Sequence, residues 1–257
     1  MRYDVFIPCD RLKPYVKQFV ISEGNDAQTY RVLPGTSLVM GFQYQGRIAT
    51  VLGTTTRPLA KAGITGIQNG VRIFKNEPAT GSVLVVFTET GAASFLNNPI
   101  HELVGESVGL DNFLNCALLT TLADRLAEAR TDQSRIHLIE QFLLSRLQTP
   151  KSDALVSAAI QQIYLTKGTI RMTALADKLC ISQSPLEKRF RRLVGTSPKK
   201  FASIVRMQQA ISTLSTTDSL TDISIESGYF DQAHFINSFK IFTGLTPTEF
   251  LQNMPKT

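Results

Sequence analysis

The chain has 257 residues, of which 43% are hydrophobic and 19% are charged, and its formal net charge is +6. This length suits one large domain or two ordinary ones, and the composition is typical of a soluble globular protein. The longest apolar stretch, around Val83 to Phe87, is far too short to cross a bilayer, and the first residues lack a secretion-signal pattern. The cysteines, Cys9, Cys116 and Cys180, are odd in number and far apart, which indicates reduced thiols and a cytoplasmic protein.

The first part of the chain predicts short strands separated by turns. From Leu38 to Tyr44 every second residue is large and apolar, which is the period of a strand with one buried face. Gln45-Gly46 permits a tight reversal into residues 47–52, so a hairpin is expected there. Further β-rich runs at residues 71–74 and 82–88 complete the pattern of a small β-barrel or β-sandwich.

From about Phe113 the apolar period becomes helical. A first helix is predicted from leucines that recur every four residues, at Leu114, Leu118, Leu122 and Leu126. Ser134 can cap a second helix, whose apolar positions are Ile136, Ile139, Leu143 and Leu147. We expect both helices to pack on the β-rich part, with a homodimer interface as the open alternative. Residues 150–153 have the composition of a linker, so the predicted domains are 1–150 and 151–257.

Positive charge is concentrated in the second half of the chain. Residues 1–150 hold 14 Lys and Arg against 13 Asp and Glu, whereas residues 151–257 hold 13 against 8. Residues 187–200 alone contain six basic side chains and one acidic one. A basic cluster on a predicted helix indicates a polyanionic partner such as nucleic acid, and a merely solvated charged face is the competing interpretation.

Two segments of the second half repeat one pattern. FRRLVGTSPKKF at residues 190–201 and FKIFTGLTPTEF at residues 239–250 share phenylalanine, glycine, a hydroxyl residue, proline and phenylalanine at a constant offset of 49. Two copies are too few for a solenoid, so the repeat predicts a duplicated module.

The first copy, at about 170–195, has the pattern helix, turn, helix. The turn falls at Cys180-Ile181, Ser182 can cap the second helix, and Gly195 can end it. The buried face would carry apolar residues, and the opposite face carries Ser184, Lys188, Arg191 and Arg192, with Glu187 at its edge. This is the pattern of a helix-turn-helix, whose second helix fits the major groove of DNA. Two generic helical hairpins are the alternative.

The second copy, at about 220–244, has fewer charges on the equivalent helix. Asp231 can cap this helix, and its outward residues are Ala233, Asn237 and Lys240, flanked by Gln232 and His234. We therefore expect a weaker electrostatic contact, although Asn and Gln can read adenine. A helix from about 198 to 213 would join the copies over ~24 Å. The two recognition helices could then meet one face of DNA about one helical turn, ~34 Å, apart.

This tandem arrangement resembles the DNA-binding domain of the AraC/XylS family of bacterial transcription regulators. The resemblance covers residues 155–255 and is carried by TALADKLCISQSPLEKRFRRLVGTSPKKF, IVRMQQAI and ISIESGYFDQAHFINSFKIFTGLTPTEF. It implies that bases are contacted by Ser184, Glu187 and Lys188 of the first copy and by Gln232, Ala233, His234 and Asn237 of the second. It also implies an N-terminal sensor or dimerisation domain, a small-molecule effector and RNA polymerase as a partner. Asn237 and Leu251 depart from the family pattern, which often has basic residues there.

The sequence thus predicts an α+β two-domain protein with an N-terminal β-barrel or sandwich carrying helices and a C-terminal all-α tandem helix-turn-helix domain. The predicted function is sequence-specific, DNA-binding transcription regulation, with activation as the expected sign. The alternative is an enzyme with a small-molecule-binding β-domain and an accessory helical domain. The residues 1–150 offer no nucleophile–base pair or phosphate loop, and His101, His137 and His234 are too scattered for a metal site, so no metal or cofactor is expected. A helical protein-interaction module is a third interpretation.

Overall fold

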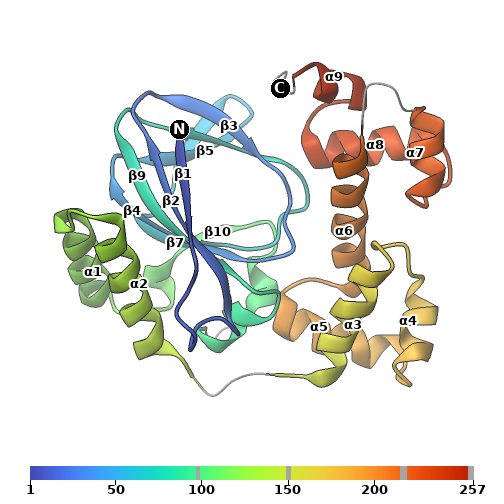
Figure 1. Ribbon diagram of the computed structural model, residues 1–257, viewed down its shortest axis with the longest axis horizontal. Helices are drawn as coiled ribbons and strands as arrows, with labels where there is room; N and C mark the ends of the chain where they lie inside the picture. Colours follow the sequence, from blue (N-terminus) through green and yellow to red (C-terminus); the bar gives the residue numbers. More distant parts are fainter. Residues whose placement is uncertain (97–98, 149–151, 215–218, 254–257) are drawn as a thin grey trace.

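The computed structural model describes residues 1–96, 99–148, 152–214 and 219–253. A β-rich part and a wholly helical part lie beside each other, in the order that the sequence predicts (Figure 1). The predicted boundary between residues 150 and 151 lies outside the described residues. Among the described helices, none has the length and apolar character needed to span a bilayer.

The described strands form two antiparallel sheets that face each other without closing into a barrel, so of the predicted barrel or sandwich the structure has the sandwich. The larger sheet has the order β1 (Arg2–Phe6), β2 (Val16–Gly24), β9 (Thr80–Phe87), β4 (Val39–Gln45), β7 (Ala62–Thr65) and β10 (Ser107–Gly109). The smaller sheet has the order β3 (Gln28–Val32), β8 (Arg72–Asn76), β5 (Ile48–Leu52) and β6 (Thr55–Pro58).

The larger sheet separates a packed core from the space between the sheets. On β9, Val83, Val85 and Phe87 are fully buried on the face that meets the helices, as the alternation of a strand requires. The helices α1 (Cys116–Glu128) and α2 (Asp132–Arg146) cover this face (Figure 1). Short 3-10 helices, η1 (Gly91–Ser94), η2 (Ile100–Leu103) and η3 (Leu110–Asn112), extend the same layer. Phe42 of β4 meets Phe142 of α2 edge to face at 5.6 Å, which confirms that the helices pack on the β-rich part.

The predicted hairpin at Gln45-Gly46 is wrong in one respect. The chain does reverse there, with Gly46 at φ +61°, but β4 pairs with β7 and β9, whereas β5 pairs with β6 and β8. The turn therefore carries the chain from one sheet to the other. Gly46 is needed for this corner, because a Cβ atom would lie 2.9 Å from the Cα of Thr80.

The predicted apolar face of the first helix is also wrong in its register. Leu119, Leu122 and Leu126 are buried, whereas Leu118 is 39% exposed and Leu114 precedes the helix. The second helix begins earlier than predicted, because Thr131 rather than Ser134 is its cap and accepts the backbone N–H of Ser134 at 3.2 Å.

The helical part repeats itself at the predicted offset. Its first unit contains α4 (Met172–Lys178) and α5 (Gln183–Val194), and its second contains α7 (Leu220–Glu226) and α8 (Gln232–Thr243). The helix α3 (Ala154–Leu165) precedes the first unit, α6 (Pro198–Thr213) joins the two, and α9 (Pro247–Gln252) follows the second. The predicted joining helix at 198–213 is thus confirmed.

The repeat has a physical cause in the core of each unit. Phe190 meets Phe201 edge to face at 5.5 Å, and Phe239 meets Phe250 in the same way at 5.4 Å. Both pairs lock the second helix of a unit to the helix that follows it, with a contribution of about 0.5–1.5 kcal/mol beyond burial. The left-handed glycines, Gly195 at φ +88° and Gly244 at φ +78°, turn the chain between the paired helices.

The register of α1 can be tested with adjacent leucines. Leu119→Ala should lower the free energy of unfolding by about 2 kcal/mol or more, because it empties a buried position. Leu118→Ala, one residue earlier on the exposed side, should change it by less than about 0.5 kcal/mol. Urea denaturation of both variants measures the difference, and equal losses would contradict the register described here.

Candidate nucleic-acid interface

The first recognition helix, α5, is held in place by its turn and its buried face. Cys180 adopts the left-handed conformation at φ +50°, which makes the tight turn between α4 and α5 as predicted. Leu186, Phe190 and Leu193 are buried on one face. Ser182 occupies the N-cap position, but its side chain accepts no hydrogen bond there, so its predicted capping role is wrong.

The opposite face of α5 is exposed, as the sequence predicts. Ser184, Glu187, Lys188 and Arg191 all lie on it. Glu187 and Arg191 pair with each other, with 2.8 Å between Oε1 and Nε, so these two side chains screen part of each other's charge. Lys188 is exposed and has no ion pair within the described part of the chain, and the same holds for Arg192 at the edge of this face.

Arg192 is also exposed, and it lines a crevice beside the β-rich part. This crevice of about 1130 Å³ lies between α5 and the η1–η2 segment, and Lys188, Arg191, Arg192 and His101 line it. Arg189, also on its wall, lies 3.5 Å from Asp153. His101 was not predicted as part of this surface, because only the folded chain brings residue 101 next to α5.

The second recognition helix, α8, is capped more strongly than α5. The carboxylate of Asp231 accepts the backbone N–H of His234 at 2.7 Å, which confirms the predicted cap. Phe235, Phe239 and Phe242 are buried. The predicted outward residues are all exposed, and they are Gln232, Ala233, His234, Asn237 and Lys240.

Two of these exposed side chains already have partners. The amide oxygen of Gln232 accepts a hydrogen bond from Thr221 of α7 at 3.2 Å. The ring of His234 meets Tyr229 edge to face at 5.3 Å, so His234 helps to fix the turn before α8. Tyr229 is itself buried, which raises the pKa of its hydroxyl, and the Arg206 guanidinium stacks on its ring at 4.2 Å.

Phe230 is a surface feature that the sequence analysis missed. It precedes the cap of α8 and is 91% exposed, the largest value among the exposed hydrophobic side chains. A phenylalanine at the start of a recognition helix can contact the methyl group of thymine. The signal was the aromatic pair Tyr229-Phe230 at the turn, of which only the first packs inward.

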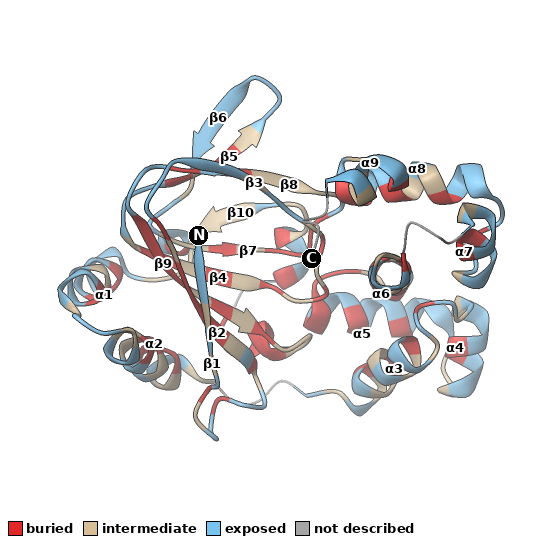
Figure 2. Cartoon of the chain, turned by 45° about the horizontal axis from the view of Figure 1, so that its top comes forward, coloured by how far each residue is buried: buried red, intermediate tan, exposed pale blue. Residues whose placement is uncertain are grey.

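Both recognition helices dock their C-terminal ends on the β-rich part and direct their N-terminal ends away from it (Figures 1 and 2). At the end of α5, Gly195 lies against the backbone of Ile100 in η2. At the end of α8, the carbonyl of Ile241 accepts the backbone N–H of Val71 at 3.3 Å. In a helix-turn-helix the N-terminal residues of the recognition helix reach the bases, so this arrangement leaves the reading ends accessible.

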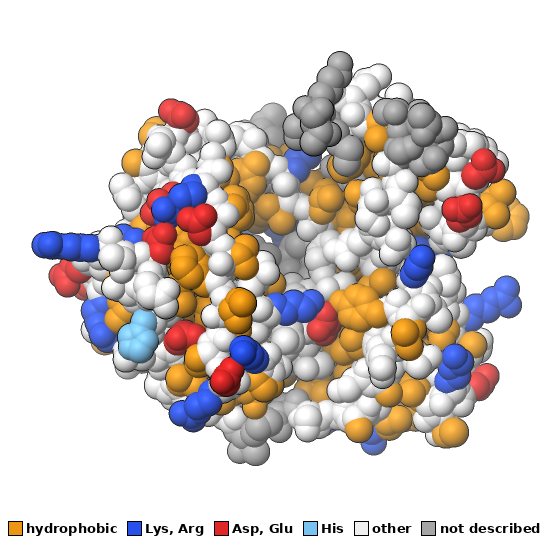
Figure 3. All heavy atoms as spheres, viewed as in Figure 1, with side chains coloured by type: hydrophobic (Ala, Val, Ile, Leu, Met, Phe, Trp, Pro, Cys, Tyr) orange, Lys and Arg blue, Asp and Glu red, His pale blue; other side chains and the backbone are white. Residues whose placement is uncertain are grey.

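The charges of the helical part are spread out on the face shown in Figure 3. Lys and Arg side chains stand there singly, separated by uncharged surface. The basic side chains on this face therefore form no continuous positive patch.

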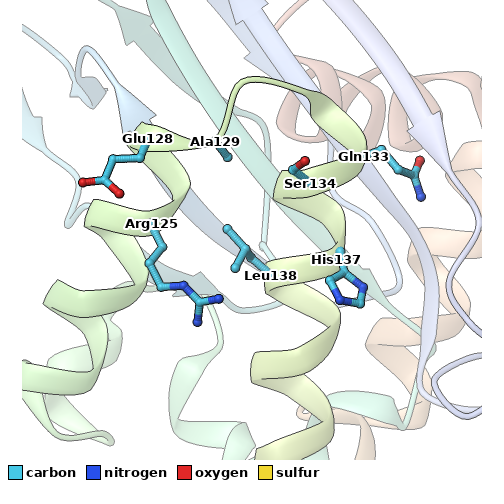
Figure 4. Close-up of a pocket in the computed structure, with 7 residues that line it drawn as sticks. All are labelled: Arg125, Glu128, Ala129, Gln133, Ser134, His137 and Leu138. Atoms are coloured by element: carbon cyan, nitrogen blue, oxygen red, sulfur yellow. The ribbon is translucent and has the colours of Figure 1, made fainter.

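A pocket between α1 and α2 tests the enzyme interpretation (Figure 4). Arg125 and Glu128 of α1 and Ser134 and His137 of α2 are among the residues that line about 470 Å³, but Glu128 and His137 point away from each other. The Ser134 hydroxyl lies 2.8 Å from that of Thr131, and His137 Nε2 lies 2.8 Å from the Gln141 amide, so neither engages the other. Within the described residues, no group of His, Cys, Asp or Glu is arranged to hold a metal ion.

Comparison with known proteins identifies the helical part. A family model described as a helix-turn-helix domain matches residues 175–253, and a model described as a domain of unknown function matches residues 4–109. The arabinose operon regulatory protein of Escherichia coli (strain K12) is 33% identical over 124 residues, which cover 45% of this chain and 42% of that protein. The Msm operon regulatory protein of Streptococcus mutans serotype c is 33% identical over 117 residues, which cover 44% and 42%. The chain thus spans less than half the length of these relatives.

Solved structures give weaker similarity. ToxT from Vibrio cholerae aligns with a TM-score of 0.48 at 13% identity, over 91% of this chain and 97% of that chain. The C-terminal domain of AraT, a response regulator from Geobacillus stearothermophilus, aligns with a TM-score of 0.39 at 22% identity, over 42% and 92%. The family model and the sequence relatives together show that the C-terminal region is an AraC-type helix-turn-helix domain, as the resemblance implied.

The unequal caps of the two recognition helices give a matched test. Asp231→Ala should destabilise the second unit by about 1 kcal/mol, because it removes the cap of α8. Ser182→Ala should have almost no effect, because the equivalent side chain makes no capping bond. Thermal unfolding of both variants measures the difference, and an equal loss from Ser182→Ala would show that α5 is capped as the sequence suggested.

Proposed function

We propose that this protein is a sequence-specific, DNA-binding transcription regulator that reads two adjacent major-groove segments with α5 and α8. The observation that carries the proposal is the pair of equivalent helix-turn-helix units, joined by α6, whose exposed N-terminal ends both carry polar side chains. The basic surplus of residues 151–257 supports a polyanionic partner. Enzymatic chemistry has no comparable support in the described residues.

The contacts divide into base reading and phosphate binding. We assign base reading to Ser184, Glu187 and Lys188 on α5 and to Gln232, Ala233, His234 and Asn237 on α8. Arg191, Arg192 and Lys240 would bind phosphates, because they lie nearer the C-terminal half of each helix. Glu187 and Arg191 form an ion pair in the free protein. This ion pair must break when either side chain contacts DNA.

The N-terminal part would supply regulation. A small-molecule effector would bind there, and the exposed sides of α1 and α2 are available for a homodimer. RNA polymerase is the expected partner of an activator of this class. The free cysteines, Cys9, Cys116 and Cys180, agree with a reducing cytoplasm.

Selection of oligonucleotides by the full chain tests this function. Recovered sites should contain two short contacted blocks about one helical turn apart, because α6 fixes the spacing of the two units. Binding should weaken steeply as salt is raised. Random recovery at moderate salt would exclude sequence-specific regulation and favour a helical protein-interaction module.

Lys188 is the sharpest single test of base reading. Lys188→Ala should cost about 1–3 kcal/mol on the selected site and relax base preference at one position. Arg130→Ala, which removes an exposed cation from the N-terminal part, serves as the control and should leave preference unchanged. Repeating the selection with both variants measures this. An equal loss on all sequences would instead assign Lys188 to phosphate.

A further inference from the structure

A cavity of about 390 Å³ lies between the two sheets, on the face of the larger sheet that the helices do not cover. Ligand pockets of small molecules have this order of volume. The floor of the cavity is apolar and is formed by three neighbouring strands of the larger sheet. It consists of the half-buried side chains of Val39 on β4 and Leu84 and Val86 on β9, together with the buried Val20 on β2. The mouth is marked by lining residues that are exposed to solvent, namely Tyr3, Val5 and Val32.

The described residues that line this cavity include no Asp, Glu, Lys, Arg or His. Its lining includes two ionisable hydroxyls, those of Tyr3 and Tyr30, and burial raises the pKa of Tyr30 to about 12, so Tyr30 stays neutral. A charged ligand would therefore lose its hydration without gaining a counter-charge. An uncharged molecule loses much less hydration free energy when it enters the cavity.

One buried polar group in the cavity is unused. Ser82 on β9 is 2% exposed, and within the described chain its hydroxyl has no hydrogen-bond partner. By contrast, the amide of Gln43 is satisfied, since it donates to the carbonyl of Ala60 at 2.8 Å and accepts the N–H of Ile48 at 2.7 Å. A ligand with one polar group could hydrogen-bond to this hydroxyl, because Ser82 lines the cavity.

The segment 66–71 joins this cavity to the second recognition helix. It connects β7 of the larger sheet to β8 of the smaller one, and Thr65 and Phe74 on either side both line the cavity. The segment is bound to the residues just before the strand β10, because Gly66 donates to the carbonyl of Glu106 at 3.0 Å and Gly105 donates to that of Ile67 at 2.9 Å. A change in the separation of the sheets must therefore move 66–71 as a unit.

The far end of the same segment touches both α6 and α8. The ammonium group of Lys200 donates to the carbonyl of Asn69 at 3.1 Å, and Val71 donates to the carbonyl of Ile241 at 3.3 Å. Gly70 lies so close to α8 that a Cβ atom would be 2.7 Å from the carbonyl oxygen of Ile241. Val71 also lies against the end of α8, since a Cβ atom at Gly244 would be 3.1 Å from its side chain, so movements of 66–71 reach α8 through direct contacts.

We infer that the cavity between the sheets binds an uncharged, largely apolar small molecule anchored by Ser82, and that its occupancy is transmitted through residues 66–71 to the C-terminal end of α8. The transmission would adjust how α8 is held relative to α5, which is fixed separately by η1 and η2. The regulatory meaning of this movement rests on the proposed function, because it presumes that α8 reads DNA. The assignment of the binding site does not depend on the proposed function.

Binding is tested on the full chain with two fluorescent probes that share one ring framework. N-phenylnaphthylamine is uncharged, and anilinonaphthalene sulfonate adds a negative charge. The uncharged probe should saturate one site per chain and bind at least about ten-fold more tightly than the sulfonate. Equal affinity for the two probes would overturn the assignment of ligand class.

Two variants locate the site. Gly41→Leu places a side chain in the cavity, and its Cβ atom would meet only Leu84 at an ordinary 3.4 Å, so the variant should fold and bind the uncharged probe at least about ten-fold more weakly. Ser82→Ala should weaken binding about three-fold by removing the anchor. Ser212→Ala, on the exposed side of α6, should change nothing. Unaltered binding by Gly41→Leu would overturn the site.

Hydrogen exchange tests the transmission without DNA. Saturation with the uncharged probe should change amide exchange rates at residues 66–71 and 240–244 by about three-fold or more. In Gly70→Ala, and in Lys200→Met as a second variant, the change at 66–71 should remain while that at 240–244 is lost. If 240–244 responds equally in both variants, or never responds, the transmission is wrong. Failure of oligonucleotide selection would overturn the proposed function but leave these outcomes interpretable.

Discussion

The arrangement of this protein depends on one constraint, which is that both recognition helices rest their C-terminal ends on the β-rich part. Gly195 at the end of α5 and Ile241 near the end of α8 meet η2 and the 66–71 segment, respectively. Since α6 alone joins the two units, their relative placement would otherwise depend on one helix. The β-rich part thus acts as a common support, and it leaves free the helix ends that can enter a major groove.

The two units are not supported equally. Around the first unit, α5 packs along η1 and η2, the Tyr164 hydroxyl donates to Glu89 at 2.6 Å, and the Gln208 amide donates to the carbonyl of Pro34 at 3.1 Å. Burial would raise the pKa of Glu89, but hydrogen bonds from Lys17 and Tyr164 outweigh it and lower that pKa, so the carboxylate is charged at neutral pH. The second unit meets the β-rich part through the backbone of Ile241 and at Gly244, which lies beside Val71 and Arg31. The unit with more basic residues is therefore also the more firmly fixed one.

The sequence predicted the helical part well because its signals are local. The offset of 49 residues, the left-handed glycines and the capping residues all act within a few residues of where they are seen, and Phe190 and Phe239 repeat because each packs on its own partner ring. The apolar face predicted for α1 is wrong for a geometric reason. Four residues advance a helix about 40° beyond a full turn, so leucines at every fourth position drift off one face, and Leu118 is left exposed while Leu119 is buried.

Contacts between distant parts of the chain could not be predicted in the same way. Gly46 signals a turn, but whether β4 and β5 pair or enter different sheets is decided by β7, β8 and β9, far along the chain. His101 likewise joins the crevice beside α5 only through folding, and the partner that Arg191 finds in Glu187 depends on rotamers that the spacing permits but does not require.

The contact between α8 and the β-rich part is weak, so a ligand can regulate the position of α8. A backbone hydrogen bond contributes about 0.5–1.5 kcal/mol, and free energies of coupling between sites are typically about 1–3 kcal/mol. A ligand that changes the spacing of the sheets therefore needs only a small part of its binding energy to make or break the bond between Val71 and Ile241. The more numerous contacts of α5 would resist the same displacement. Control would thus fall on the recognition helix that carries less charge, where a modest change in position has the largest relative effect on DNA binding.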